Sequence, residues 1–287
     1  MDPRYLLVIS EPDPVAVRVA ERWGTPPSTG DWVDGAPIRQ LSTGALLLRR
    51  SGSHIHDERL DHRLPTPLRE RALPLVFPSV HRSEQNLPCL TVHPLGNPGP
   101  TAEVGGEPRT LVPSEPRLMA AALRAMDELG PAAGLRATYE ATHHGPRLDS
   151  PALFVEIGFG LLPGPPEEAV EILARILPHL EPSMEDHPAL GVGGGHYAPH
   201  FTDLALRRRW AFGHILSRHA LGVLDAATAR SALALTPRAE GAVYARASDA
   251  SLPVLAGIGP RLRDGNAPVR PGTTAPPTVG ARRASGT

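Results

Sequence analysis

Short apolar runs alternate along the chain with stretches rich in glycine, proline and polar residues, and they predict strands that alternate with helices. The first run, residues 5–9, is typical of a buried strand. Asp13 and Pro14 then supply a helix cap followed by proline at the first helical position, and apolar residues repeat at helical spacing until Gly24. A strand followed by a helix is the usual opening of an α/β fold.

The same criteria predict the later elements. Strands are expected at residues 44–50, 73–77, 89–92, 135–142, 152–157 and 190–192. Helices are expected at residues 114–129, with Ser114 as the cap, and at residues 165–177 and 201–227. Residues 25–44 are expected to be irregular, and residues 51–67 to form a solvated, charged loop that contains His54, His56 and His62. We predict one domain over residues 1–264 and a disordered tail rich in Pro, Gly and Arg over residues 265–287.

The composition narrows the chemistry that the chain can perform. All 29 basic residues are arginine, which excludes a lysine nucleophile, a Schiff base and a Walker lysine. The formal net charge of -1 neither requires nor excludes RNA, because a local arginine patch could still bind it. Cys89 is the only cysteine, so any metal must be held by His, Asp or Glu. With no signal region and no run near the roughly 20 apolar residues of a membrane span, we expect a soluble cytoplasmic protein.

Histidines follow several of the predicted strands. Those at or just after the end of an apolar run are His81, His93, His143, His144 and His196. If the strands are parallel, these imidazoles converge on one edge of the sheet, whereas an antiparallel strand would send its histidine to the other side. Glu156 interrupts the apolar run 152–157, and its carboxylate is costly to bury without a cation, a metal or hydrogen-bond donors. Five imidazoles and one carboxylate therefore predict a mono- or dinuclear zinc hydrolase.

The glycine-rich segment at residues 191–199 and His214 each have two possible interpretations. Residues 191–199 read Gly-Val-Gly-Gly-Gly-His-Tyr-Ala-Pro and fail the dinucleotide-binding pattern, because His196 occupies the position of the last glycine. The N–H groups of Gly193, Gly194 and Gly195 could cradle a phosphate or a substrate oxyanion, or the glycines could form only a tight turn. His214, four positions after Trp210 on the expected last helix, is either structural or a second donor to an oxyanion.

Several motifs together resemble the archaeal and plant-type D-aminoacyl-tRNA deacylases. They read Tyr-Glu-Ala-Thr-His-His-Gly-Pro at residues 139–146, Phe-Val-Glu-Ile-Gly at 154–158, Ala-Leu-Gly-Val-Gly-Gly-Gly-His-Tyr-Ala-Pro at 189–199 and Ala-Phe-Gly-His-Ile-Leu at 211–216. Leu-Pro-Cys-Leu-Thr-Val-His at residues 87–93 adds to the match, which covers residues 73–220. The chain departs from the family at Val80, where the family has arginine, and from Phe159 onward.

The resemblance implies a three-layer α/β/α fold with a mixed, mostly parallel central sheet, similar to peptidyl-tRNA hydrolase. It also implies a zinc-dependent enzyme that hydrolyses the ester between a D-amino acid and the 3′-terminal ribose of tRNA. The family's characteristic residues fall on His81, His93, Asn97, Glu140, Thr142, His143, His144, Glu156, His196, Tyr197 and His214. We expect tRNA as the partner, with neither DNA nor a membrane, and a monomer.

Among these positions we assign roles by inference. Zn²⁺ is expected on His81, His93, His144 and His196, with Glu156, His143 and His214 catalytic. Substrate binding is expected from Asn97, Glu140, Thr142, Gly193, Gly194, Gly195 and Tyr197. Because adjacent residues on a strand point apart, only one of His143 and His144 is expected to bind the metal. The alternatives are a peptidyl-tRNA or other aminoacyl-ester hydrolase on the same fold, and a non-catalytic tRNA-end binder with a structural zinc.

Overall fold

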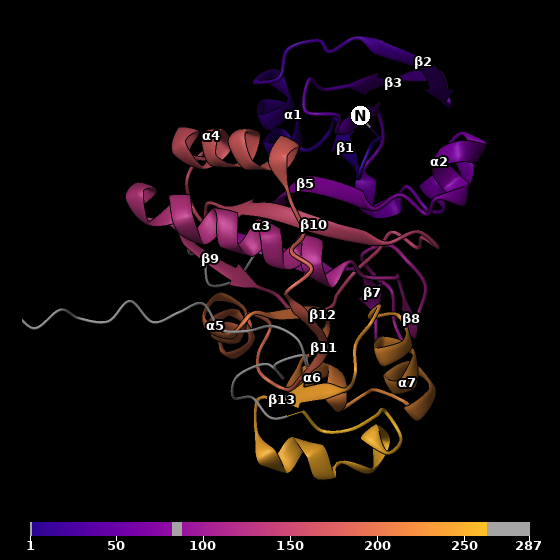
Figure 1. Cartoon of the computed structure of the whole chain (residues 1–287), viewed down its shortest axis with the longest axis vertical. Coiled ribbons are helices and arrows are strands. Elements are labelled where there is room, and N and C mark those ends of the chain that lie inside the picture. The colour runs from indigo at the N-terminus through magenta and orange to yellow at the C-terminus, as the bar shows by residue number, and fades with distance from the viewer. Residues whose placement is uncertain (1, 82–87, 263–287) are drawn as a thin grey trace, which may run out of the picture.

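An eight-stranded mixed sheet forms the centre of the computed structural model, which describes residues 2–81 and 88–262 (Figure 1). The strand order is β2-β3-β4-β1-β5-β10-β6-β9. The strands are β1 (Leu6–Ser10), β2 (Ser28–Val33), β3 (Ala36–Gln40), β4 (Leu46–Arg50), β5 (Leu75–His81), β6 (Cys89–Pro94), β9 (Arg136–Tyr139) and β10 (Ala152–Gly158). The pairs β4–β1, β1–β5, β5–β10 and β6–β9 are parallel, and β2–β3, β3–β4 and β10–β6 are antiparallel. The predicted α/β class with a mixed, mostly parallel sheet is confirmed.

Helices cover one face of this sheet. They are α1 (Pro14–Glu21), α3 (Pro116–Leu129) and α4 (Glu167–Ile176), seen together on one side in Figure 1. Successive strand residues point to opposite faces, so Val155 of β10 packs with these helices while Phe154 belongs to a second apolar cluster on the other face. That second face is covered by the short helix α2 (Thr66–Glu70) and by loops. Glu156 shares it with Phe154, so its carboxylate lies away from the helical layer.

A second, three-stranded parallel sheet lies beside β9. It has the order β12-β11-β13, from β11 (His187–Val192), β12 (Trp210–Leu216) and β13 (Ala242–Tyr244). The remaining elements are α5 (Pro199–Arg208), α6 (Arg218–Leu221), α7 (Ala226–Ala234) and the paired short strands β7 (Gly96–Asn97) and β8 (Thr110–Leu111). Backbone hydrogen bonds join the segment after β9 to this second sheet, from Ala141 to His196 at 2.8 Å and from Thr142 to Ile215 at 2.9 Å. These bonds bring His196 against the edge of the main sheet.

Most of the strongly patterned segments are found as predicted. Strands occur at the apolar runs 44–50, 73–77, 89–92, 152–157 and 190–192, and helices occur within 114–129 and 165–177. Asp13 caps α1 by accepting hydrogen bonds from the N–H groups of Val15 and Ala16. Ser114 does not cap α3; its hydroxyl donates to the carbonyl of Leu235.

The helix predicted over residues 201–227 is wrong. Helix α5 ends where Arg209 adopts a left-handed conformation with φ of 59°, and β12 follows directly as a fully buried strand. A short apolar run that is buried on both sides has no strand periodicity, so its pattern did not separate it from a helix.

Two segments predicted as loops also carry more structure than expected. Residues 25–44 contain the hairpin of β2 and β3, whose exposed residues lack the apolar alternation that would have revealed it. Residues 51–67 are not simply a solvated loop, because His54 is buried within them. No helix in the described ranges is long and apolar enough to cross a membrane. The predicted tail, residues 265–287, lies outside those ranges, and the single domain over residues 1–264 stays a prediction.

Candidate functional site

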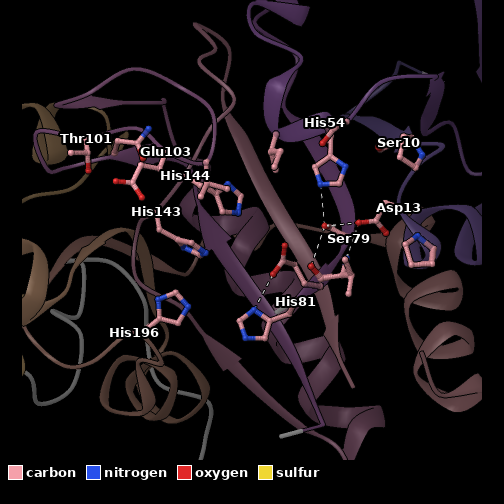
Figure 2. Close-up of a pocket in the computed structure, with 18 residues that line it drawn as sticks. Ser10, Asp13, His54, Ser79, His81, Thr101, Glu103, His143, His144 and His196 are labelled. Carbon is pink, nitrogen blue, oxygen red and sulfur yellow. Dashed lines mark hydrogen bonds and ion pairs between the residues drawn. The ribbon is translucent and has the colours of Figure 1, made fainter. Parts of the chain in front are cut away.

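A cavity of about 710 Å³ opens on the sheet face that carries Glu156. Figure 2 shows His143, His144 and His196 on one side of it, His54, Ser79 and Asp13 on the other, and His81 between them. The cavity thus collects side chains from strand ends and loops that are distant in the sequence.

The register of β10 explains why His81 and His93 meet at Glu156. Strand β5 is parallel to β10 and places His81 opposite Gly158, whereas β6 is antiparallel and places His93 opposite Phe154. Gly158 and Phe154 lie two residues on either side of Glu156 and share its face. The two imidazoles therefore approach Glu156 diagonally from opposite directions. Of the two alternatives that the sequence left open, the antiparallel one holds for His93, and it puts the two histidines on either side of one carboxylate.

His93, His143 and His144 have free ring nitrogens that face a common point. Each uses Nδ1 to donate to a backbone carbonyl, at 3.1 Å to Pro94, 2.8 Å to Ala141 and 2.7 Å to Gly145. In a neutral ring this leaves Nε2 as a lone-pair acceptor, which is the tautomer that a metal ligand requires. One possible metal-ligand nitrogen from each of the three rings lies within 4.8 Å of the other two.

Burial keeps two of these rings uncharged. It lowers the pKa of His144 to about 4, and burial, reinforced by the neighbouring His93, His144 and His196, lowers the pKa of His143 well below its ordinary value. Both imidazoles are therefore neutral at pH 7. A neutral imidazole is the form that binds a metal ion.

A second group of possible metal ligands surrounds Glu140. Its two oxygens lie 3.1 Å from Nδ1 of His81 and 3.1 Å from Nε2 of His196, yet neither makes a hydrogen bond of acceptable geometry, and the carboxylate is fully buried. His81, Glu140 and His196 form a group with donor atoms within 4.8 Å of one another, and so do His93, Glu140 and Glu156. A buried carboxylate without hydrogen-bond donors is costly, so this arrangement fits a bound cation.

Glu156 lies between two histidines. Its Oε2 lies 3.2 Å from Nδ1 of His81, and its Oε1 lies 3.6 Å from Nε2 of His93, which is too long for a hydrogen bond. Burial alone would raise its pKa, but His81 and His93 hold the pKa of Glu156 well below its ordinary value. In return, Glu156 raises the pKa of His81 against the effect of burial. Glu156 is therefore ionised at neutral pH.

His143 and His144 do not point apart. They follow β9 rather than extend it, and His144 has a left-handed backbone with φ of 43°. The ring centroids are 4.5 Å apart, and both rings line the cavity. The alternation of a strand does not apply to this turn, so the expectation that the two side chains point apart is wrong.

The other predicted residues hold the site from outside or at its rim. Asn97 lines the cavity and donates to the carbonyl of Gly105 at 2.8 Å. The Tyr197 hydroxyl lies 2.8 Å from Nε2 of His81, which fixes that ring from behind. Gly193, Gly194 and Gly195 are not among the cavity-lining residues; a Cβ on Gly193 would lie 2.4 Å from Asp249 Oδ2, so the turn that presents His196 needs glycine there.

His214 and Thr142 form a support behind the cavity. His214 is fully buried and does not line the cavity; its Nε2 donates to the Val112 carbonyl at 3.0 Å, and its Nδ1 accepts from the Thr142 hydroxyl at 3.1 Å. Thr142 Oγ1 also accepts from the N–H of Ile215. Both therefore position the turn that carries His143 rather than reach a substrate.

Replacing His214 with glutamine is expected to make folding less sensitive to acid. Burial lowers the pKa of His214 from 6.5 to about 4, so between these values the unfolded chain binds a proton that the folded chain does not. This group costs stability as the pH falls below 6.5 and has no effect above it. At pH 5 the cost is about 2 kcal/mol. Urea unfolding at pH 7 and pH 5 measures the free energy of unfolding, which should fall less between these pH values in the variant than in the wild type. An equal fall in both proteins would contradict the lowered pKa of His214.

One part of the cavity was missed from the sequence. Ser79 donates to Asp13 Oδ2 at 2.9 Å, and His54 Nε2 lies 3.1 Å from the same hydroxyl. The interpretation of His54 as solvated is wrong, because it is buried against the Phe154 ring and lines the cavity. Ser79 precedes His81 by two positions on one strand, and this shared face was a usable signal. Nothing in the sequence placed His54 beside it.

Comparison with known proteins gives consistent matches. A family model described as D-aminoacyl-tRNA deacylase matches residues 69–252. The D-aminoacyl-tRNA deacylase of Thermoplasma acidophilum is 38% identical over 173 residues, which cover 60% of this chain and 67% of the relative. That of Pyrococcus abyssi is 37% identical over 191 residues, covering 65% and 69%. That of Methanoregula boonei is 44% identical over 153 residues, covering 53% of this chain, and the chain spans only 34% of that relative.

A solved structure matches over more of the chain. The crystal structure of a conserved protein of unknown function has a TM-score of 0.71 and 27% sequence identity, covering 84% of this chain and 86% of the other. The likeness therefore covers more of the chain than the segment matched by the family model.

Proposed function

The chain belongs to the D-aminoacyl-tRNA deacylase family, and from this premise we propose that it hydrolyses the ester bond of D-aminoacyl-tRNA to release a free D-amino acid and tRNA. The proposal rests on one observation: five imidazoles and two buried carboxylates meet at a cavity of about 710 Å³. They belong to His81, His93, His143, His144, His196, Glu140 and Glu156. A cavity of that size admits a terminal nucleotide ester of an amino acid. Such an enzyme would remove mischarged D-amino acids and so proofread the chirality of tRNA charging.

The donors fit a zinc site. His93 Nε2 and both Glu140 oxygens are buried polar atoms without a hydrogen-bond partner among the described residues. Imidazole nitrogen and carboxylate oxygen are ordinary zinc ligands. His93, His143 and His144 would hold one ion, and His81, Glu140 and His196 would hold a second. Zinc bound there would supply a nucleophile at neutral pH by lowering the pKa of water towards about 7.

The chain's own residues would orient the reaction. Glu156 is ionised and borders the cavity, so it can accept a hydrogen bond from the attacking water and take its proton. The Tyr197 hydroxyl lies 2.8 Å from Nε2 of His81 and fixes that ring, so that Nδ1 faces Glu140 and Glu156. His214, Gly193, Gly194 and Gly195 have no direct role in this scheme, because they lie outside the cavity wall.

A chiral assay tests the proposal. tRNA charged with D-tyrosine or L-tyrosine is incubated with the protein, and the remaining aminoacyl-tRNA is measured with time. We expect rapid loss of the D-tyrosyl ester and little loss of the L-tyrosyl ester. Equal rates would favour a general aminoacyl-ester hydrolase on the same fold. Tight binding of charged tRNA without hydrolysis of either ester would favour a non-catalytic tRNA-end binder.

A further inference from the structure

Glu103 places a carboxylate at the cavity wall that the proposed chemistry does not use. It lines the cavity, and Figure 2 shows it on the side of His143 and His144. Within the part of the chain that the structure describes, no hydrogen bond or ion pair engages its side chain. The carboxylate is also exposed to solvent, so it is free to meet a ligand that enters the cavity.

The loop that carries Glu103 is held firmly in place. The carbonyl of Val104 accepts from the N–H of Gly145 at 3.1 Å, and the carbonyl of Gly105 accepts from Asn97 Nδ2 at 2.8 Å. A Cβ on Gly105 would lie 1.7 Å from the Ile55 carbonyl oxygen, so the backbone there touches the neighbouring turn. The loop therefore presents Glu103 beside the turn of His143 and His144 without a large ordering cost on binding.

The other acids of the cavity already have partners. Asp13 accepts hydrogen bonds from two N–H groups of α1 through Oδ1, and from Ser79 and Val80 through Oδ2. Glu156 is engaged by His81. No arginine is among the residues that line this cavity in the described part of the chain. Glu103 is thus the lining carboxylate left to compensate a positive charge on a substrate.

We propose that Glu103 binds the α-ammonium group of the aminoacyl ester and so selects free aminoacyl groups over N-acylated ones. The inference rests on the proposed function. A free α-amino group can carry a positive charge near neutral pH, whereas an N-acyl group is a neutral amide that cannot. A charge-assisted hydrogen bond to Glu103 would therefore form with an aminoacyl substrate and be lost with a peptidyl-like one.

The test compares Glu103→Gln with the wild type on D-tyrosyl-tRNA and N-acetyl-D-tyrosyl-tRNA. We expect kcat/KM for D-tyrosyl-tRNA to fall about 10-fold or more, and that for the N-acetyl ester to stay the same. Glu107→Gln is the matched control: Glu107 lies in the same loop, is exposed, pairs with Arg59 at 3.5 Å and does not line the cavity. It should behave as wild type on both substrates.

A binding measurement covers the case in which the N-acetyl ester turns over too slowly. The probes are 3′-(D-tyrosylamino)-3′-deoxyadenosine, which cannot be hydrolysed as an ester, and its N-acetyl derivative. The wild type should bind the free amine about 10-fold more tightly, and Glu103→Gln should remove that preference. Equal losses on both ligands, or no loss on either, would overturn the proposal. A wild type that binds both probes with the expected preference but hydrolyses no D-aminoacyl-tRNA would refute the proposed function alone.

Discussion

Replacing Glu156 with glutamine is expected to lower kcat on D-tyrosyl-tRNA by about 10²- to 10⁴-fold, the range for loss of a general base. Glutamine keeps the shape of the side chain but cannot take a proton from water. The group is ionised in the folded protein because His81 and His93 hold its pKa well below its ordinary value. Single-turnover kinetics with D-tyrosyl-tRNA, together with an equilibrium measurement of tRNA binding, separate the chemical step from binding.

Binding of tRNA should be retained in this variant, because Glu156 is buried in the cavity wall and contributes almost nothing to the exposed surface. Glu185→Gln is a suitable control, since that exposed side chain pairs with Arg209 and neither residue is among those that line the cavity. If Glu156→Gln hydrolysed the ester at the wild-type rate, the role assigned to Glu156 would be wrong. Loss of tRNA binding together with turnover would point instead to a collapsed cavity.

Replacing Glu140 with glutamine is expected to weaken zinc binding by at least about 10- to 100-fold and to lower turnover with it. Glu140 belongs to two of the groups that could hold a metal ion, and both of its buried oxygens lack hydrogen-bond partners among the described residues. A neutral amide at this position would remove the charge that favours a cation between His81 and His196. Mass spectrometry measures the zinc content of the variant. Equilibrium dialysis against buffers of known free zinc concentration then measures how much its zinc affinity has fallen.

Glu185→Gln is again the control, because it alters an exposed carboxylate that is not among the residues lining the cavity. It should keep the wild-type zinc content. Chelation of the wild type should abolish hydrolysis, and added zinc should restore it. Full metal content in Glu140→Gln, or unchanged activity after complete chelation, would contradict a zinc site at these residues.

The family and the candidate residues of the site could be predicted from residue types and their positions along the chain. With one cysteine and no lysine, the histidines and Glu156 were the donors available for a metal, and the motifs around residues 139–146 and 189–199 indicated the family. The sequence predicted Glu140 only as a substrate-binding residue, because in the strand pattern it occupies the position of a polar residue on an exposed face. Only the packing of His81 and His196 around it revealed that both of its oxygens are buried.

The amino-acid sequence by itself determined the local elements with strong apolar patterns and the set of residues able to bind a metal, because both depend on residue type and short-range spacing. Tertiary structure alone decided how they meet. The antiparallel course of β6 sets His93 opposite His81 across Glu156, and the left-handed His144 turns two adjacent imidazoles to one side. Strand direction and turn geometry depend on contacts between segments far apart in the chain, so Asp13, His54 and Glu103 joined the cavity without any local signal.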